Sequence, residues 1–237
     1  MCIRDSVYGV LVLVGPKSRE VLSELTNEDL SNTSFPWLIG KEINVDNIPV
    51  KALRINYVGE LGWELHHNFK DIKQLYERLM NVGKKYNISN FGTYGVNSLR
   101  LEKAYKGWCS ELTGEISLIE AGMNRFYNLD KKDQFIGSEA LKEKISNGIE
   151  IKIVYLEVDT EDADALGNEP VYFDNKIVGV VTSGGYGFRV KKSLAFAYIN
   201  SSVIDVKEFE IQIQGSMRKA KVLDQMAYDP GNAKLKS

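Results

Sequence analysis

The sequence predicts an α+β protein made of two regions that differ in the pattern of their apolar residues. Up to about Gly148, segments typical of strands alternate with segments in which apolar residues recur at helical spacing. From Glu150 onward, short strand-like runs follow one another at regular spacing and no helical pattern interrupts them. We therefore expect a first domain over residues 1–148 and a second, a small β-barrel or sandwich, over residues 149–237.

The composition is that of an ordinary globular protein and excludes several classes of function. The 237 residues are 43% apolar and 26% charged, with a formal net charge of −2 and a pI near 5.9. The chain therefore lacks the excess of basic residues that is typical of proteins that bind nucleic acid. No run of apolar residues approaches the ~18 that a membrane-spanning helix needs. Two cysteines, Cys2 and Cys109, fit a reducing compartment better than a disulfide scaffold, and no residue cluster predicts a metal site.

The first region is expected to open with a buried strand at residues 7–14, a continuous apolar run that ends at Gly15-Pro16. An amphipathic pattern, with a stripe from Ile72 to Met80, predicts a long helix. A strand-like run from Glu120 to Leu129 and a short helix that ends at Gly148 complete the region, and this glycine is our domain boundary. The remaining expected elements are helices at residues 18–25, 71–86 and after residue 94, and strands at residues 41–45 and 50–56.

In the second region, alternating and apolar runs predict six strands. They are residues 151–158, 170–173, 176–183, 193–199, 208–213 and 217–222. A cluster of glycines, from Gly184 to Gly187, is expected either to form flexible turns of the barrel or to contact the first domain.

The chemically most suggestive stretch is Tyr57-Val58-Gly59-Glu60-Leu61-Gly62-Trp63-Glu64-Leu65-His66. Its two glycines let the backbone approach a ligand closely, and its carboxylates and aromatic rings are the groups that a flat, nitrogen-rich ring requires. The alternative is a structural hairpin with Gly-Glu at its tip and with Trp63 and Leu65 facing the core. Spacing alone does not separate the two interpretations.

Four landmarks in this order resemble the glycine-cleavage T-protein (aminomethyltransferase) superfamily, and most of all the folate-binding, C-terminal part of the dimethylglycine and sarcosine dehydrogenases. The first is the Tyr57–His66 stretch, whose Val-Gly-Glu-Leu-Gly-Trp-Glu form is typical of the dehydrogenases. The others are Asn-Ser-Leu-Arg-Leu-Glu-Lys at residues 97–103, Thr-Ser-Gly followed by Lys-Ser-Leu-Ala within residues 182–195, and Tyr228-Asp229-Pro230. The resemblance extends from about Val7 to Lys234.

The resemblance implies a T-protein-like domain of antiparallel sheets with flanking helices, followed by a small C-terminal β-barrel. It also implies tetrahydrofolate as cofactor and a one-carbon unit, released from a methylated amine, that is captured as 5,10-methylenetetrahydrofolate. FAD is then expected on a separate N-terminal flavin domain, which would be the partner of this region, and neither nucleic acid nor a membrane is expected as a partner.

Carried over position by position, the resemblance implies a folate site on the central stretch. Glu64 is expected to accept hydrogen bonds from the pterin amino and ring N–H groups, with Glu60 as the alternative carboxylate. Arg125 is a further candidate, as the partner of a folate carboxylate. The full set of expected folate-binding residues is Tyr57, Leu61, Gly62, Trp63 and Glu64, with Glu60 and Arg125 in addition.

Two departures from the family pattern affect the expected activity. Val96 stands where T-proteins have an arginine that helps at the folate site. The aspartate that the family uses in catalysis lies upstream of residue 1, so we expect an N-terminally truncated fragment with no catalytic residue and no activity of its own. Residues Met1–Ser6, which lack the apolar core of a secretory signal, are expected not to be native sequence.

Other functions remain open. A stand-alone aminomethyltransferase or a folate-dependent demethylase is the first alternative, and Val96 argues against a T-protein. A non-catalytic folate-binding assembly module is the second, although Lys106-Gly107-Trp108-Cys109 only weakly matches the cysteine motif of such proteins. A ligand-free structural domain is the third. The expected location is the cytoplasm for a bacterial protein and the mitochondrial matrix for a eukaryotic one.

Overall fold

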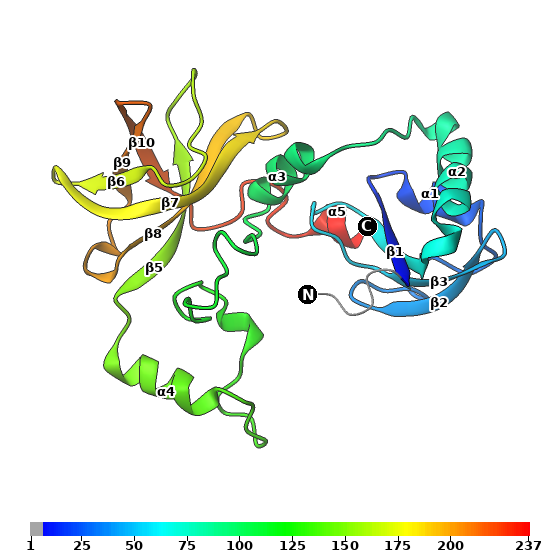
Figure 1. Ribbon diagram of the computed structural model, residues 1–237, viewed down its shortest axis with the longest axis horizontal. Helices are drawn as coiled ribbons and strands as arrows, with labels where there is room; N and C mark the ends of the chain where they lie inside the picture. The colour runs from blue at the N-terminus through cyan, green and yellow to red at the C-terminus, as the bar shows by residue number, and fades with distance from the viewer. Residues whose placement is uncertain (1–6) are drawn as a thin grey trace. The chain divides into compact units, whose positions relative to one another are not determined.

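A computed structural model describes residues 7–237 and shows two compact units (Figure 1). One comprises the described residues through Val96 together with Asp229–Ser237, and the other comprises Asn97–Tyr228. The helix α3 (Thr93–Glu102) contains the point of division. The domain boundary predicted at Gly148 stays a prediction.

The first unit is built on a four-stranded antiparallel sheet with the strand order β1-β4-β3-β2. Its N-terminal strand, β1, therefore lies at an edge and pairs with β4 along its whole length. The helices of this unit are short except for α2, which carries 3₁₀ turns at both ends. The elements are β1 (Tyr8–Val14), α1 (Ser18–Ser23), β2 (Gly40–Val45), β3 (Ile48–Leu53), β4 (Gly62–Asn68), α2 (Ile72–Gly83) and α5 (Ala233–Lys236).

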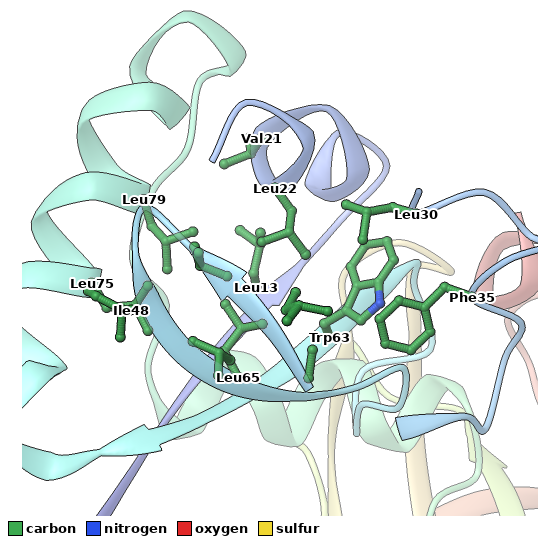
Figure 2. Packing of buried hydrophobic residues seen from close by; sticks show 14 of the residues in the cluster. Leu13, Val21, Leu22, Leu30, Phe35, Ile48, Trp63, Leu65, Leu75 and Leu79 are labelled. Atoms are coloured by element: carbon green, nitrogen blue, oxygen red, sulfur yellow. The ribbon is translucent and has the colours of Figure 1, made fainter. Parts of the chain in front are cut away.

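One face of this sheet is packed against α1 and α2 and forms the core of the unit (Figure 2). Leu22 of α1 and Leu75 of α2 are fully buried, and they meet Leu65 and Trp63 from β4. The Trp63 ring lies beside the ring of Phe35, with centroids 6.1 Å apart. The alternation of buried and partly exposed residues along β4 follows directly from the two-residue period of a strand, which sends successive side chains to opposite faces.

The second unit contains a closed barrel of six antiparallel strands in the order β10-β5-β8-β7-β6-β9, preceded by a segment with little regular structure. Closure removes the exposed strand edges that an open sheet would leave. Each predicted strand is present, and β7 is longer than expected because it includes the glycine cluster. The elements are α4 (Ser138–Asn147), β5 (Ile151–Val158), β6 (Pro170–Phe173), β7 (Lys176–Gly187), β8 (Lys192–Asn200), β9 (Glu208–Ile213) and β10 (Ser216–Val222).

One sequence prediction about this unit is wrong, and one of two alternatives is excluded. The run from Glu120 to Leu129 is not a strand: it consists of turns and a 3₁₀ helix at Asn124–Phe126. The glycine cluster does not form turns, because Gly184 and its neighbours are paired within β7 against β8. The Asn97 side-chain amide, which belongs to the same unit, donates to the Gly184 carbonyl at 3.3 Å. A contact of the cluster with the first domain stays a prediction.

The C-terminal part of α3 is tied to the barrel by buried polar contacts. Arg100 pairs with Glu111 at 3.1 Å and donates to the Ser183 hydroxyl at 2.8 Å. Glu102, fully buried, pairs with Arg189 at 2.7 Å. Arg100 and Glu102 therefore hold the C-terminal part of α3 within its unit.

Candidate functional site

The outer face of the four-stranded sheet carries the candidate site, because it presents the side chain of Glu64. Trp63, Leu65 and His67 of β4 are buried on the core face, whereas Glu64 and His66 project from the opposite face and are partly exposed. The alternative in which Trp63 and Leu65 face the core is thus the arrangement in the structure. Trp63, at 0% exposure, and Leu61 can line a site on the outer face only through their backbones.

Glu64 is flanked by apolar residues on both neighbouring strands. Val12 of β1 and Leu53 of β3 are its direct cross-strand partners. Directly opposed residues of an antiparallel pair point to the same face of the sheet, so these side chains stand on either side of the carboxylate. Val10 and Val12 are 44% and 47% exposed, unusually open for valines on a strand, and form an apolar strip along the sheet edge beside Glu64.

A hydrogen bond from the same strand orients the Glu64 carboxylate. Nε2 of His66 lies 3.1 Å from Oε2 of Glu64. An ionised carboxylate can only accept, so Nε2 carries the hydrogen in this pair. Residues i and i+2 of a strand share a face, and this period was a signal in the sequence that places His66 beside Glu64. Our sequence analysis did not assign His66 to the site.

The loop that enters β4 is shaped by Asn56, a second residue that the sequence analysis missed. Its side-chain oxygen accepts from the backbone N–H groups of Val58 and Gly59, at 3.0 and 2.9 Å, and its amide donates to the Glu60 carbonyl at 2.6 Å. Asparagine commonly fixes tight loops in this way, and Gly59 takes the positive φ of 73° that the turn requires. Tyr57 lies in this loop and is 39% exposed.

Gly62 is the point at which the loop joins the sheet, and its backbone packs too tightly for any side chain. A Cβ at this position would lie 2.4 Å from the Leu13 carbonyl oxygen and 2.6 Å from Cγ1 of Val14. The second glycine of the motif therefore serves the pairing of β4 with β1. Glu60, the alternative carboxylate, lies in the loop before β4 and is partly exposed, so strand alternation does not relate it to Glu64.

The expected folate-binding residues fall into two groups. Tyr57, Glu60, Leu61, Gly62, Trp63 and Glu64 are gathered in the loop and β4 of the first unit. Arg125 belongs to the second unit, where it is exposed and its guanidinium lies over the ring of its neighbour Phe126, 4.7 Å from the centroid. Within residues 7–237, no group of three or more histidine, cysteine, aspartate or glutamate residues is placed to hold a metal ion. No helix of this described part is long and apolar enough to cross a bilayer.

Comparison with protein families explains why these motifs occur together. Residues 2–131 match the GCVT N-terminal domain, and residues 152–229 match the glycine cleavage T-protein C-terminal barrel domain. The chain belongs to the glycine cleavage T-protein family. The resemblance drawn from four landmarks is thereby confirmed, and so is the expected α+β fold with a C-terminal barrel.

Individual members of the T-protein family are similar to this chain over most of its length. It is 42% identical over 231 residues to mitochondrial dimethylglycine dehydrogenase of Mus musculus, covering 96% of this chain and 27% of the relative. It is 31% identical over 236 residues to mitochondrial sarcosine dehydrogenase of Mus musculus, covering 96% of this chain and 26% of the relative. The chain therefore spans about a quarter of the length of these two dehydrogenases.

A solved structure supports the fold. Aminomethyltransferase T of the glycine cleavage system from Bartonella henselae superposes with a TM-score of 0.82 at 23% identity, covering 94% of this chain and 60% of that chain. Two strands of this T-protein fold, β1 and β4, thus position the Val10–Val12 strip and the Glu64–His66 pair on one surface.

Proposed function

We propose that the first unit binds tetrahydrofolate on the outer face of its sheet, with Glu64 as the anchor for the pterin ring. The observation that carries this proposal is the placement of the Glu64 carboxylate between apolar cross-strand neighbours on an exposed sheet face. The two oxygens of a carboxylate match paired N–H donors such as the 2-amino and ring N–H groups of a pterin, and a charged acceptor strengthens both bonds. The apolar strip of Val10 and Val12 offers a surface on which a flat ring can lie.

The remaining residues of the proposed site are Tyr57 and the backbone of the Asn56–Gly62 loop. Tyr57 carries an exposed ring at the start of this loop, and Asn56 holds the loop in shape. Glu60 is the alternative acceptor for the pterin N–H groups. Arg125 is the proposed partner of a folate carboxylate. Bound tetrahydrofolate supplies the nitrogens that take up the one-carbon unit.

We propose further that the whole protein is a flavin-dependent N-methyl-amine dehydrogenase of the dimethylglycine or sarcosine type. Support comes from the two dehydrogenase relatives, which match over nearly the whole of this chain. In this proposal a flavin domain outside the 237 residues oxidises the methylated amine, and the present region captures the released one-carbon unit as 5,10-methylenetetrahydrofolate. Both of these relatives are mitochondrial proteins, and we propose the mitochondrial matrix if the source is eukaryotic and the cytoplasm if it is bacterial.

A stand-alone aminomethyltransferase is the second candidate, favoured by the fold shared with aminomethyltransferase T over 94% of this chain. Both candidates use the same folate site and differ in the donor of the one-carbon unit. Flavin absorbance of the full-length protein and its oxidation of dimethylglycine or sarcosine separate them: a flavin-free protein that turns over neither amine would favour the aminomethyltransferase.

Calorimetric titration with tetrahydrofolate, under anaerobic conditions, tests the proposed site. We expect the wild-type chain to bind and the Glu64→Gln variant to bind about tenfold or more weakly, because replacing a charged acceptor removes about 1.5–3 kcal/mol. Glu42→Gln is the matched control: Glu42 lies on β2 of the same sheet, and its ammonium partner Lys51 is 3.8 Å away. Equal affinity of wild type and Glu64→Gln would move the anchor away from Glu64, and loss of binding in both variants would contradict a specific role.

A further inference from the structure

The side chains of Glu64 and His66 form a polar pair on the outer face of the sheet. Both are roughly seven-tenths buried, with 28% and 31% of their side-chain surfaces exposed. Of the residues that the structure describes, His66 is the one whose side chain donates to the Glu64 carboxylate. The bond uses Oε2 of Glu64 and therefore fixes the plane of the carboxylate relative to the sheet.

The charged groups that face His66 come from the neighbouring strand β3. Lys51 is its direct cross-strand partner, and Lys51 in turn lies near Glu42 of β2. On the other side, β1 places Val10 directly opposite His66, and Tyr8 lies two pairs further along, opposite Asn68. His66 thus lies between the carboxylate of Glu64 and the ammonium group of Lys51, with the apolar residues of β1 on the remaining side.

We propose that His66 is the positioning residue of the folate site: its imidazole N–H holds the Glu64 carboxylate in the orientation that accepts the paired N–H donors of the pterin. This inference rests on the proposed function and deepens it. A single hydrogen bond at Oε2 leaves Oε1 and one lone pair of Oε2 for the ligand, since a carboxylate offers about four acceptor positions. Without His66 the carboxylate rotates freely, and binding must then order it, which costs affinity.

Two variants separate positioning from packing. His66→Gln keeps an N–H donor near Glu64, and His66→Phe keeps a ring of similar size without a donor. If His66 only filled space, His66→Phe would bind as the wild type does, so affinity that is lost in His66→Phe and retained in His66→Gln indicates positioning by the hydrogen bond.

The test is titration of the three proteins with tetrahydrofolate under the same conditions. His66→Gln should bind within about twofold of the wild type, and His66→Phe should be weaker by about three- to tenfold.

The two possible failures are distinct. If His66→Phe binds as tightly as the wild type, or if His66→Gln loses as much affinity as His66→Phe, His66 does not position Glu64 and the inference is overturned while the folate site stands. If the wild type does not bind tetrahydrofolate, the proposed function fails and this inference fails with it. Circular dichroism of each protein identifies any loss of affinity that comes from unfolding.

Discussion

Arg54 and Ser237, 183 positions apart in the sequence, are joined by a 2.8 Å hydrogen bond from Nη2 of the arginine to the carbonyl oxygen of the serine. Nη2 of Arg19 donates to the same oxygen, also at 2.8 Å. Nη1 of Arg54 donates to the Phe35 carbonyl at 2.6 Å. The last residues of the chain thus form part of the first unit, and the indole of Trp63 lies 5.8 Å from each of the two guanidinium groups.

Replacing Arg54 with methionine should lower the free energy of unfolding of the first unit by about 2–3 kcal/mol, because the buried Phe35 carbonyl and the partly buried contact with Ser237 lose a charged donor. Arg54 is 1% exposed, and burial, together with the nearby charge of Arg19, lowers its pKa from the ordinary value. Urea denaturation followed by tryptophan fluorescence measures the change. Arg78→Met is the matched control, since Arg78 is half exposed and forms a surface ion pair with Asp46 worth ~0–1 kcal/mol. Equal losses in the two variants would show that the C-terminal segment is not held by Arg54.

The pairing of β4 with β1 should depend on the absence of a side chain at Gly62. The added methyl group of Gly62→Ala would lie 2.4 Å from the Leu13 carbonyl oxygen, so the backbones must separate, and we expect a loss of stability of about 1–3 kcal/mol or more. Gly92→Ala is the control in the same unit, because no atom lies within 4 Å of its added Cβ. Thermal unfolding compares the two variants, and a Gly62→Ala protein as stable as Gly92→Ala would contradict the close approach.

Much of this fold could be predicted from the sequence because its signals are local. The strand runs of the barrel and the apolar stripe of α2 depend on periods of two and 3.6 residues, and both are present at the expected positions. The strand prediction for Glu120 to Leu129 failed because the apolar residues there match the pattern of a strand. The backbone instead turns at Gly122, which adopts a positive φ of 61°. Local composition does not determine whether a partner strand exists.

The candidate site was predictable in its residues and not in its geometry. The motif located Glu64, and alternation along the strand could have added His66, but whether Trp63 faced a ligand or the core depended on which face of β4 met α1. The contact of Arg54 with Ser237 has no local signal at all, since it joins segments separated by the whole second unit.

Exposed valines on an edge strand give a direct test of the surface beside Glu64. Val12→Thr changes the polarity of the strip and keeps a β-branched residue that suits a strand, so the fold should be retained. If a flat ring lies on this strip, affinity for tetrahydrofolate should fall by about three- to tenfold in the calorimetric assay. The same change at Val50, which lies on β3 and is buried in the core, should lower stability instead of folate affinity. Unchanged folate affinity in Val12→Thr would place the ring elsewhere on the sheet.

The buried carboxylate of Glu111 should make the second unit sensitive to acid. Burial alone would raise its pKa, but hydrogen bonds from Ser183, Thr182 and the Gly107 N–H, with the charge of Arg100, outweigh it and hold the pKa below the usual 4.5. A carboxyl group whose pKa is lowered by folding contributes stability above its unfolded pKa. That contribution is lost as the pH falls through the lower, folded value.

Glu111→Gln should therefore destabilise the second unit by about 3–5 kcal/mol near neutral pH, because Arg100 is left as a buried charge without its partner. The difference between wild type and variant should shrink as the pH is lowered below the usual carboxyl value, because the wild type then loses the same negative charge. Denaturant unfolding at neutral and acidic pH measures both quantities. Glu139→Gln, at an exposed pair with Lys142, serves as the control and should change neither. A difference between wild type and Glu111→Gln that stays constant with pH would mean that the charge of Glu111 does not stabilise the link between α3 and the barrel.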